Sequence, residues 1–281
     1  MGQPLTPEVL IYAWKQPGDP QVSPDGSRIV YTLTEVDPGA KKTTSHLWLC
    51  QIDGGQPRRL TWSGQRNGGA RWSPDGRSIA FVSDRVEKSG IFVLPLEEGG
   101  EAREVTRHRQ PISGLAWSPD GRQIAYVTTF DPENPNEEEP PKDMAPRVRV
   151  TRRIDYKQDG RGYVGDARQQ VFVVDVESGE RRRLTDEPLD HELPQWSPDG
   201  RWIAARRLRL NGMFSQLVLV PVDGGEPRVV GPETGVIGAW AWSPGGDRIL
   251  YAGDLEKSWH HDLFLYDLAS DTSRRLTDDL P

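Results

Sequence analysis

A four-residue motif that returns along the chain constrains the fold more than any other feature of this sequence. Ser-Pro-Asp-Gly occurs four times, and a fifth copy reads Ser-Pro-Gly-Gly. The five copies are Ser23–Gly26, Ser73–Gly76, Ser118–Gly121, Ser197–Gly200 and Ser243–Gly246. A period of roughly 40–50 residues indicates a repeat architecture in which each repeat is one supersecondary unit. The third repeat is the longest, because 79 residues separate Pro119 from Pro198.

A second motif keeps the same register. Arg-Arg-Leu-Thr occurs three times, and two weaker versions, Arg-Glu-Val-Thr and Arg-Val-Val-Gly, fill the gaps in the series. The five versions end at Thr61, Thr106, Thr185, Gly231 and Thr277. Two unrelated motifs in one register make a chance repeat a poor explanation. The chain therefore contains five units of about 46 residues, the third enlarged by an insertion.

Each unit is predicted to form four short strands. In the third unit the expected strands are Ile112–Trp117, Gln123–Thr128, Gln170–Val176 and Arg181–Thr185. The motif between the first two is a hairpin turn, since proline presets φ and glycine supplies a positive φ. The second strand is apolar on both faces, which requires a neighbouring sheet on each side. Four-stranded sheets packed face to face at this period are the blades of a β-propeller, so we predict an all-β propeller.

Tryptophan precedes the turn motif in four of the five units. The residues are Trp72, Trp117, Trp196 and Trp242, and the first unit has Val22 instead. We interpret these side chains as anchors between neighbouring blades, because a buried tryptophan removes about 150–250 Å² from water. A ring of exposed aromatic side chains that binds a ligand is the alternative.

The repeats set the expected domain boundaries. Residues 1–18 form a helical lead-in, because Thr6-Pro7-Glu8 has the pattern of a helix N-terminus. This helix is expected to reach about Lys15 and to be ended by Pro17 and Gly18. Residues 19–281 are the propeller repeats, with an inserted loop and long hairpin at 131–169.

Composition excludes several classes of partner. The chain has 42 acidic and 35 basic residues, whereas binders of nucleic acid or anionic membranes show a basic excess. Cys50 is the single cysteine, which excludes an internal disulfide and fits a reducing compartment. We expect Cys50 to be a small core residue. The N-terminus does not resemble a signal peptide and no apolar run is long enough to span a bilayer, so we expect a cytoplasmic protein.

The search for catalytic, cofactor and metal motifs identifies no site. The sequence has no Gly-x-Ser-x-Gly elbow and no phosphate-binding loop. Gly160–Gly165 matches a dinucleotide-binding pattern, but it leads into a predicted strand rather than a helix, so we expect no cofactor. His260 and His261 are adjacent, and neighbouring side chains on a strand point to opposite faces. We therefore expect no metal site.

The insertion has an unusual distribution of charge. Asp131–Pro146 carries six acids against one lysine, and Arg147–Arg161 carries six bases against two acids. The simplest interpretation is a solvated loop followed by a hairpin whose charges pair loosely. The alternative is a projection that overhangs one mouth of the propeller channel or contacts another domain or subunit. The residues that we nominate for substrate access or domain contact are Arg152, Arg153, Tyr156 and Tyr163.

Two segments resemble a known family. The Thr6–Glu8 helix start leading into Asp19–Gly26, and Arg152–Gly160 feeding Val171–Asp175, are similar to the N-terminal propeller of prolyl oligopeptidase family serine peptidases. The acylaminoacyl-peptidase-like branch is the most similar, along essentially the whole chain. The resemblance implies a propeller of typically seven blades that caps an α/β-hydrolase domain, whose Ser, Asp and His follow later in the chain. It therefore implies an incomplete propeller here, with no catalytic residue among these 281.

Three functions remain as hypotheses. The resemblance implies a non-catalytic region that acts as a size filter for the peptide substrates of the absent hydrolase domain, with homo-oligomerisation left open. The turn motif is shared with TolB-type propellers, so a stand-alone protein-binding module whose five blades close on themselves is the alternative. A hydrolase or lyase with its site on the propeller axis requires converging acids or histidines, which the sequence does not locate.

Overall fold

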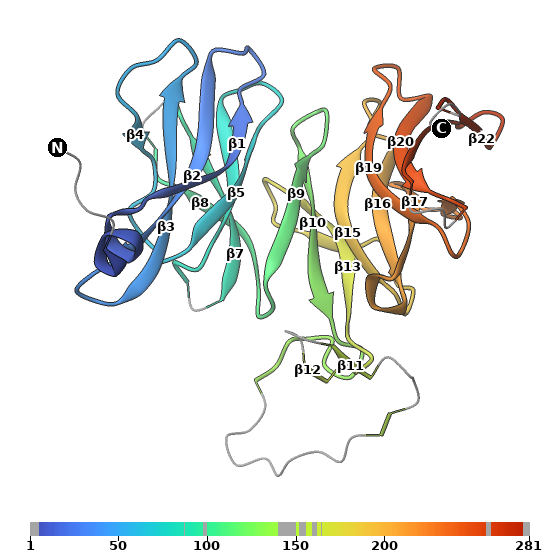
Figure 1. The fold of residues 1–281 in the computed structure, drawn as a ribbon, viewed down its shortest axis with the longest axis horizontal. Helices are drawn as coiled ribbons and strands as arrows, with labels where there is room; N and C mark the ends of the chain where they lie inside the picture. The colour runs from blue at the N-terminus through green and yellow to red at the C-terminus, as the bar shows by residue number, and fades with distance from the viewer. Residues whose placement is uncertain are drawn as a thin grey trace. The chain divides into compact units, whose positions relative to one another are not determined.

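The computed structural model describes residues 6–86, 88–97, 100–139, 150–151, 156–158, 162–163, 165–256 and 260–277. Over these residues the chain forms five antiparallel four-stranded sheets and one two-stranded pair (Figure 1). The prediction of an all-β chain built from four-stranded repeats is therefore confirmed.

The five sheets follow one another along the chain. The first contains β1 (Gln16–Val22), β2 (Arg28–Asp37), β3 (Lys42–Gln51) and β4 (Arg58–Arg59). The second contains β5 (Asn67–Trp72), β6 (Ser78–Ser83), β7 (Ser89–Pro95) and β8 (Arg103–His108). The third contains β9 (Ile112–Trp117), β10 (Gln123–Phe130), β13 (Arg168–Asp175) and β14 (Arg181–Arg183). The fourth contains β15 (Asp190–Trp196), β16 (Trp202–Arg209), β17 (Phe214–Pro221) and β18 (Arg228–Val230). The fifth contains β19 (Val236–Trp242), β20 (Arg248–Asp254), β21 (Asp262–Asp267) and β22 (Thr272–Arg275).

Every sheet orders its strands as they occur in the sequence, so each repeat is a meander. The chain divides into two compact units. Unit one comprises residues 1–124 and 174–181, and unit two comprises residues 125–173 and 182–281. Unit one thus holds the first two sheets and unit two the last two, while strands of the third sheet contribute to both.

The turn motif forms the same hairpin in each sheet. In the second sheet the Gly76 N–H donates to the Ser73 carbonyl at 2.9 Å, and the Ser73 hydroxyl donates to the Asp75 carboxylate at 2.6 Å. Gly76 has a φ of +70°, a conformation that costs an ordinary L-residue roughly 1–2 kcal/mol. The glycines of the other turns, Gly26, Gly121, Gly200 and Gly246, also have positive φ and donate to the motif serine. Each motif residue therefore has its own structural role.

The fifth turn keeps this geometry although its sequence differs. Gly245 stands where the other four turns have aspartate. The Ser243 hydroxyl donates instead to Asp247, two residues further along, at 2.7 Å. A carboxylate acceptor for the motif serine is therefore retained.

Prolines of the turns also pack within each unit. A Cβ atom on the next turn's glycine would lie 3.5–3.7 Å from a proline ring carbon, which is ordinary van der Waals contact. The pairs are Pro24 with Gly76, Pro74 with Gly121, and Pro198 with Gly246. The motif thus shapes its own hairpin and contacts the next one.

In three of the five sheets the threonine of the second motif adds a hydrogen bond to the third strand. Where the short outer strand ends, the threonine hydroxyl accepts the backbone N–H of the third strand at 2.9–3.0 Å. The pairs are Leu47 with Thr61, Val171 with Thr185, and Leu263 with Thr277. The second motif therefore ends the outer strand, and its threonine side chain continues the hydrogen bonding to the third strand.

Apolar side chains fill the space between neighbouring sheets within each unit. In unit one the first and second sheets pack through Val30, Leu47, Leu49, Ala70, Trp72, Ile79, Phe81, Phe92 and Leu94. In unit two the fourth and fifth sheets pack through Ala204, Leu217, Leu219, Val230, Ile237, Trp240, Ile249, Tyr251, Phe264 and Tyr266. In the third sheet Ile124, Ala125 and Tyr126 are fully buried, as expected for a strand that is apolar on both faces.

The tryptophans before the turns connect neighbouring inner strands. In unit one the Trp72 indole N–H donates to the Gln21 carbonyl and that of Trp117 donates to the Arg71 carbonyl, each at 3.0 Å. Trp72 is 9% exposed, which supports the interpretation as a packing anchor. In unit two the Trp242 indole N–H is buried and makes no hydrogen bond within the described chain. Equivalent tryptophans therefore differ in hydrogen bonding.

The N-terminal helix is shorter than predicted. The Thr6 hydroxyl accepts the Val9 N–H at 3.3 Å, which confirms the predicted start. The segment η1 (Val9–Ala13) is a wide, π-type turn, and it ends because Trp14 is extended with ψ 117°. The prediction that Pro17 and Gly18 end the helix is wrong, since both lie in β1 and pair with β2.

Cys50 is half-buried, so its prediction as a core residue is wrong. Side chains alternate along β3, and Leu47 and Leu49 take the face that packs on the second sheet. Cys50 consequently lies on the opposite face of the first sheet. Cys50 therefore identifies the face of the first sheet that does not pack on the second sheet.

The tryptophan hydrogen bond can be tested with one pair of variants. Trp117→Phe and Trp242→Phe remove the same atoms at equivalent positions of the repeat. We expect Trp117→Phe to lower the free energy of unfolding by about 1 kcal/mol more than Trp242→Phe, because only Trp117 loses a hydrogen bond. Urea unfolding of both variants measures the difference. Equal losses would mean that the bond to Arg71 does not stabilise the fold.

Candidate functional site

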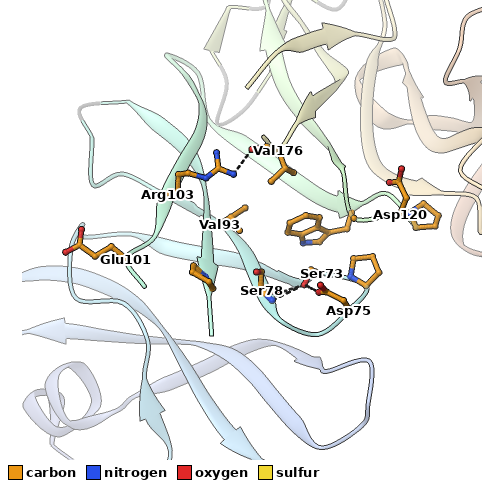
Figure 2. A pocket seen from close by; sticks show the side chains of 13 residues that line it. Ser73, Asp75, Ser78, Val93, Glu101, Arg103, Asp120 and Val176 are labelled. Atoms are coloured by element: carbon orange, nitrogen blue, oxygen red, sulfur yellow. Dashed lines mark hydrogen bonds between the residues drawn. The ribbon is translucent and has the colours of Figure 1, made fainter. Parts of the chain in front are cut away.

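A groove opens in unit one between the turns of the second and third sheets (Figure 2). Its volume is about 790 Å³. Its polar lining is Ser73, Asp75, Ser78, Glu101, Arg103 and Asp120, and its remaining lining is Pro74, Val93, Pro95, Trp117, Pro119, Gly121 and Val176. The groove is thus built largely from the turn motifs themselves.

Both turn carboxylates in the groove accept hydrogen bonds from their own turns. The pKa of Asp75 lies below its usual value near 3.8, chiefly because the Ser73 hydroxyl and then the Arg77 N–H donate to it. Asp120 has a lowered pKa for the corresponding reason, with Ser118 as the donor. These carboxylates are ionised near neutral pH and hold the turns together. Neither is suited to act as a general acid.

Polar side chains that line the groove are bonded within the fold. The Ser73 hydroxyl donates to Asp75 and accepts the Ser78 N–H at 2.9 Å. Arg103 donates to the Val176 carbonyl at 2.6 Å (Figure 2). No histidine or cysteine is among the described residues that line the groove, and the carboxylate nearest to Ser73, that of Asp75, accepts the Ser73 hydroxyl as part of the turn.

The nominated tyrosines lie together on the inserted hairpin. The strands β11 (Lys157–Gln158) and β12 (Gly162–Tyr163) pair over two residues each, near the ends of β10 and β13 (Figure 1). The rings of Tyr156 and Tyr163 are 6.3 Å apart, and the Lys157 ammonium lies 5.7 Å from the Tyr163 ring. The two tyrosines are 45% and 54% exposed. Arg152 and Arg153 lie outside the described residues, and a role in substrate access or domain contact stays a prediction.

Unit two contains a buried polar cluster that the sequence analysis missed. We call it the His191 cluster, and it comprises Gln170, Thr185, Glu187, His191, Arg207 and Gln216. Arg207 pairs with Glu187 at 2.7 Å and donates to the Gln216 side chain at 2.8 Å. Gln170 accepts from Thr185 at 2.5 Å and donates to the Glu187 carbonyl at 2.8 Å. A signal was present, because Arg206 and Arg207 stand where the equivalent strands of the other repeats have uncharged residues.

His191 is the unusual member of the cluster. It lies opposite Arg207 in the register of β15 and β16 and is fully buried. Neither ring nitrogen makes a hydrogen bond of normal geometry within the described chain. Burial lowers the pKa of His191 below its usual value near 6.5, against the opposing effects of Glu187 and of nearby backbone carbonyls. The folded state therefore favours the neutral imidazole.

The described residues show neither a metal centre nor a membrane span. They contain no group of three or more His, Cys, Asp or Glu placed to hold a metal ion. No helix within the described ranges has the length and apolar character needed to cross a bilayer.

Comparison with known proteins identifies the class to which these sheets belong. Residues 14–134 match the family model of the TolB β-propeller domain. The matched residues are therefore similar to TolB-type propeller repeats, the described chain has the sheets of a β-propeller fold, and its homologues include a peptidase.

Three relatives illustrate this similarity. YuxL of Bacillus subtilis, described as an uncharacterized peptidase, is 31% identical over 186 residues, or 66% of this chain. An acylaminoacyl peptidase from Pyrococcus horikoshii superposes on 97% of this chain with a TM-score of 0.71 and 18% identity. A TolB structure described as putative, from Agrobacterium tumefaciens, superposes on 94% of this chain with a TM-score of 0.61 and 21% identity. The last two likenesses show the fold alone.

The similarity covers different shares of these relatives. The matched region spans 28% of YuxL and 41% of the acylaminoacyl peptidase chain, but 81% of the TolB chain. This chain therefore resembles one region of the two peptidases and most of the TolB chain.

The buried histidine predicts a dependence of stability on pH. Because the folded state keeps His191 neutral, its contribution is present above pH 6.5 and is lost as falling pH protonates the unfolded chain. We expect His191→Asn, which copies Asn67 at the equivalent position of the second sheet, to reduce the loss of unfolding free energy between pH 7 and pH 5. The difference is at most about 1.4 kcal/mol per pH unit. Denaturant unfolding at a series of pH values measures it, and parallel curves would contradict the assignment.

Proposed function

We propose that this chain is the non-catalytic propeller region of a serine peptidase, in which it admits peptides and excludes folded proteins. The observation that carries the proposal is the 31% identity to the peptidase YuxL, of which the matched region covers 28%. On this proposal the hydrolase domain lies outside the 281 residues and supplies the nucleophile. In the described groove the Ser73 hydroxyl is already bonded to Asp75 and to the Ser78 N–H, which is consistent with this division of labour.

The exposed face of the fifth sheet supports an incomplete propeller. Leu250 is 39% exposed, whereas the residue six positions after the motif proline is fully buried in each of the other sheets. Those residues are Val30, Ala80, Ala125 and Ala204. The third strand shows the same contrast, since Leu263 is 40% exposed while its counterparts Leu47, Ile91, Val171 and Leu217 are fully buried. The fifth sheet thus presents a blade-packing face without a described blade against it.

The proposed size selection can be tested with one protein in two states. A small disulfide-bonded protein is offered to the immobilised chain in its native form and in its reduced, alkylated form. We expect only the unfolded form to bind, because an extended chain can enter where a folded domain cannot. Equal binding of the native form would contradict a size filter.

The absence of a nucleophile is tested separately. A serine-reactive fluorophosphonate probe is expected to leave the native chain unlabelled, with a heat-denatured sample as the control for nonspecific reaction. Labelling that a single Ser→Ala substitution abolishes would show that the chain carries its own catalytic serine, and the proposed division of labour would fail.

A TolB-like protein-binding module is the second candidate. It is favoured by the similarity that covers 81% of the TolB chain from Agrobacterium tumefaciens. In such a module five blades close on themselves, so the outer face of the fifth sheet would be covered by the first. The accessibility of that face separates the two candidates.

Cysteine labelling measures this accessibility. In a Cys50→Ser background, we expect Leu250→Cys to react with an aromatic disulfide reagent at least roughly tenfold faster than Ala204→Cys, which occupies the equivalent buried position of the fourth sheet. Equally slow reaction of both would show that a blade covers Leu250, and the self-closing module would be favoured.

A further inference from the structure

The first strand of four of the five sheets contains an irregularity at the same place. In the four sheets whose register is defined, pairing with the second strand shifts a few residues before the turn motif. In the fourth sheet the shift lies between Glu192 and Gln195. Bulges of this kind bend an edge strand and redirect a side chain, and they are often found beside functional sites.

The repeat places a left-handed residue within this bulge. The residue five positions before the motif proline has a φ between +47° and +64° in the first four sheets. These residues are Asp19, Gly69, Gly114 and Leu193. The second and third sheets use glycine, which adopts this conformation without strain. The fourth sheet uses a leucine.

Leu193 is strained without local compensation. Leucine is unfavourable at positive φ, and Pro194 further restricts the residue that precedes it to extended conformations. Asp19, at the equivalent position, uses its carboxylate to accept from Gln21 and to pair with Arg71. The Leu193 side chain has no such use within the fold, because it is apolar and 47% exposed. Strain of this kind accumulates where a side chain serves a function.

The surroundings of Leu193 are those of a peptide-recognition edge. Glu192 forms an ion pair with Arg206 at 2.6 Å, and both side chains are about a third exposed or less. Arg206 also reaches the Gly238 carbonyl of β19 at 3.4 Å. β15 is the terminal strand of its sheet, so its outer edge offers backbone groups that no strand of that sheet uses. An apolar tip, a charge pair and a strand edge therefore lie together.

We propose that Leu193, beside the Glu192–Arg206 pair, is a contact for an apolar side chain of an extended peptide. The inference rests on the proposed passage of peptides through this region. The strand edge and the ion pair present polar groups that complement a peptide backbone, and Leu193 distinguishes apolar from polar side chains. The bulge holds the leucine outward at the expense of backbone strain.

The test compares two glycine substitutions. Leu193→Gly removes the side chain and the strain together. Leu210→Gly is the matched control, because Leu210 also has positive φ and is 53% exposed, but lies at the tip of the hairpin between β16 and β17. The probes are two fluorescein-labelled, acetylated nonapeptides that differ only by leucine or serine at the central position. Binding is followed by fluorescence anisotropy up to millimolar chain concentration.

The expected pattern is specific. The wild-type chain prefers the leucine peptide, Leu193→Gly binds that peptide roughly tenfold more weakly, and Leu210→Gly binds as the wild type does. Both variants should melt at or above the wild-type temperature, since glycine relieves the strain at each site.

Other outcomes would contradict either this inference alone or the proposed passage of peptides as well. If Leu193→Gly binds both peptides as the wild type does, or melts at a lower temperature with unchanged binding, the leucine has a structural role and only this inference fails. If the wild-type chain binds neither peptide, the proposed passage of peptides fails with it.

Discussion

The structure depends on the burial of one sheet face against the next. Val30, Ala80, Ala125 and Ala204 hold the same position in four sheets and are all fully buried. At roughly 25 cal/mol per Å² of apolar surface, contacts repeated at every sheet supply the main driving force for folding. A single meander has no closed core of its own, so each repeat is stabilised by its neighbour. The exposed Leu250 and Leu263 show what such a face looks like when no described sheet packs on it.

The hydrogen bonds of the motifs make this stacking regular. The motif serine, aspartate and glycine fix each hairpin, the proline contacts the next turn, and the threonine of the second motif ends the outer strand. These polar side chains use their hydrogen-bonding groups within the fold. Ser73 illustrates the consequence, since its hydroxyl is already bonded to Asp75 and to the backbone of Ser78. A serine-rich repeat can therefore line a groove without providing a nucleophile.

The sequence predicted the parts of the fold that the repeat dictates. The strand limits Ile112–Trp117 and the turn glycines were read correctly, because proline, glycine and two-faced apolar strands have strong local signatures. Features that depend on the sheet face on which a side chain lies, or on pairing with a distant strand, were not predicted correctly. Cys50 was placed in the core although only alternate residues of β3 face the second sheet, and Pro17 was expected to stop a helix although pairing with Leu33 recruits it into β1. The His191 cluster is assembled from four separate segments, and no local pattern reports such an assembly.

The residues that distinguish this chain from a regular repeat protein lie at positions that depart from the repeat pattern. Gly245 replaces the motif aspartate, and Asp247 accepts the Ser243 hydroxyl in its place, so this departure is compensated within the turn. Arg207 stands where the other repeats have an uncharged residue and is neutralised by Glu187, while His191 is left without a hydrogen bond of normal geometry within the described chain. Leu193 departs from glycine with no compensation in the fold. Leu210 carries a similar cost at a hairpin tip, so the strain alone assigns no contact; at Leu193 it coincides with the edge strand β15 and the Glu192–Arg206 pair, and this coincidence supports the proposed peptide contact.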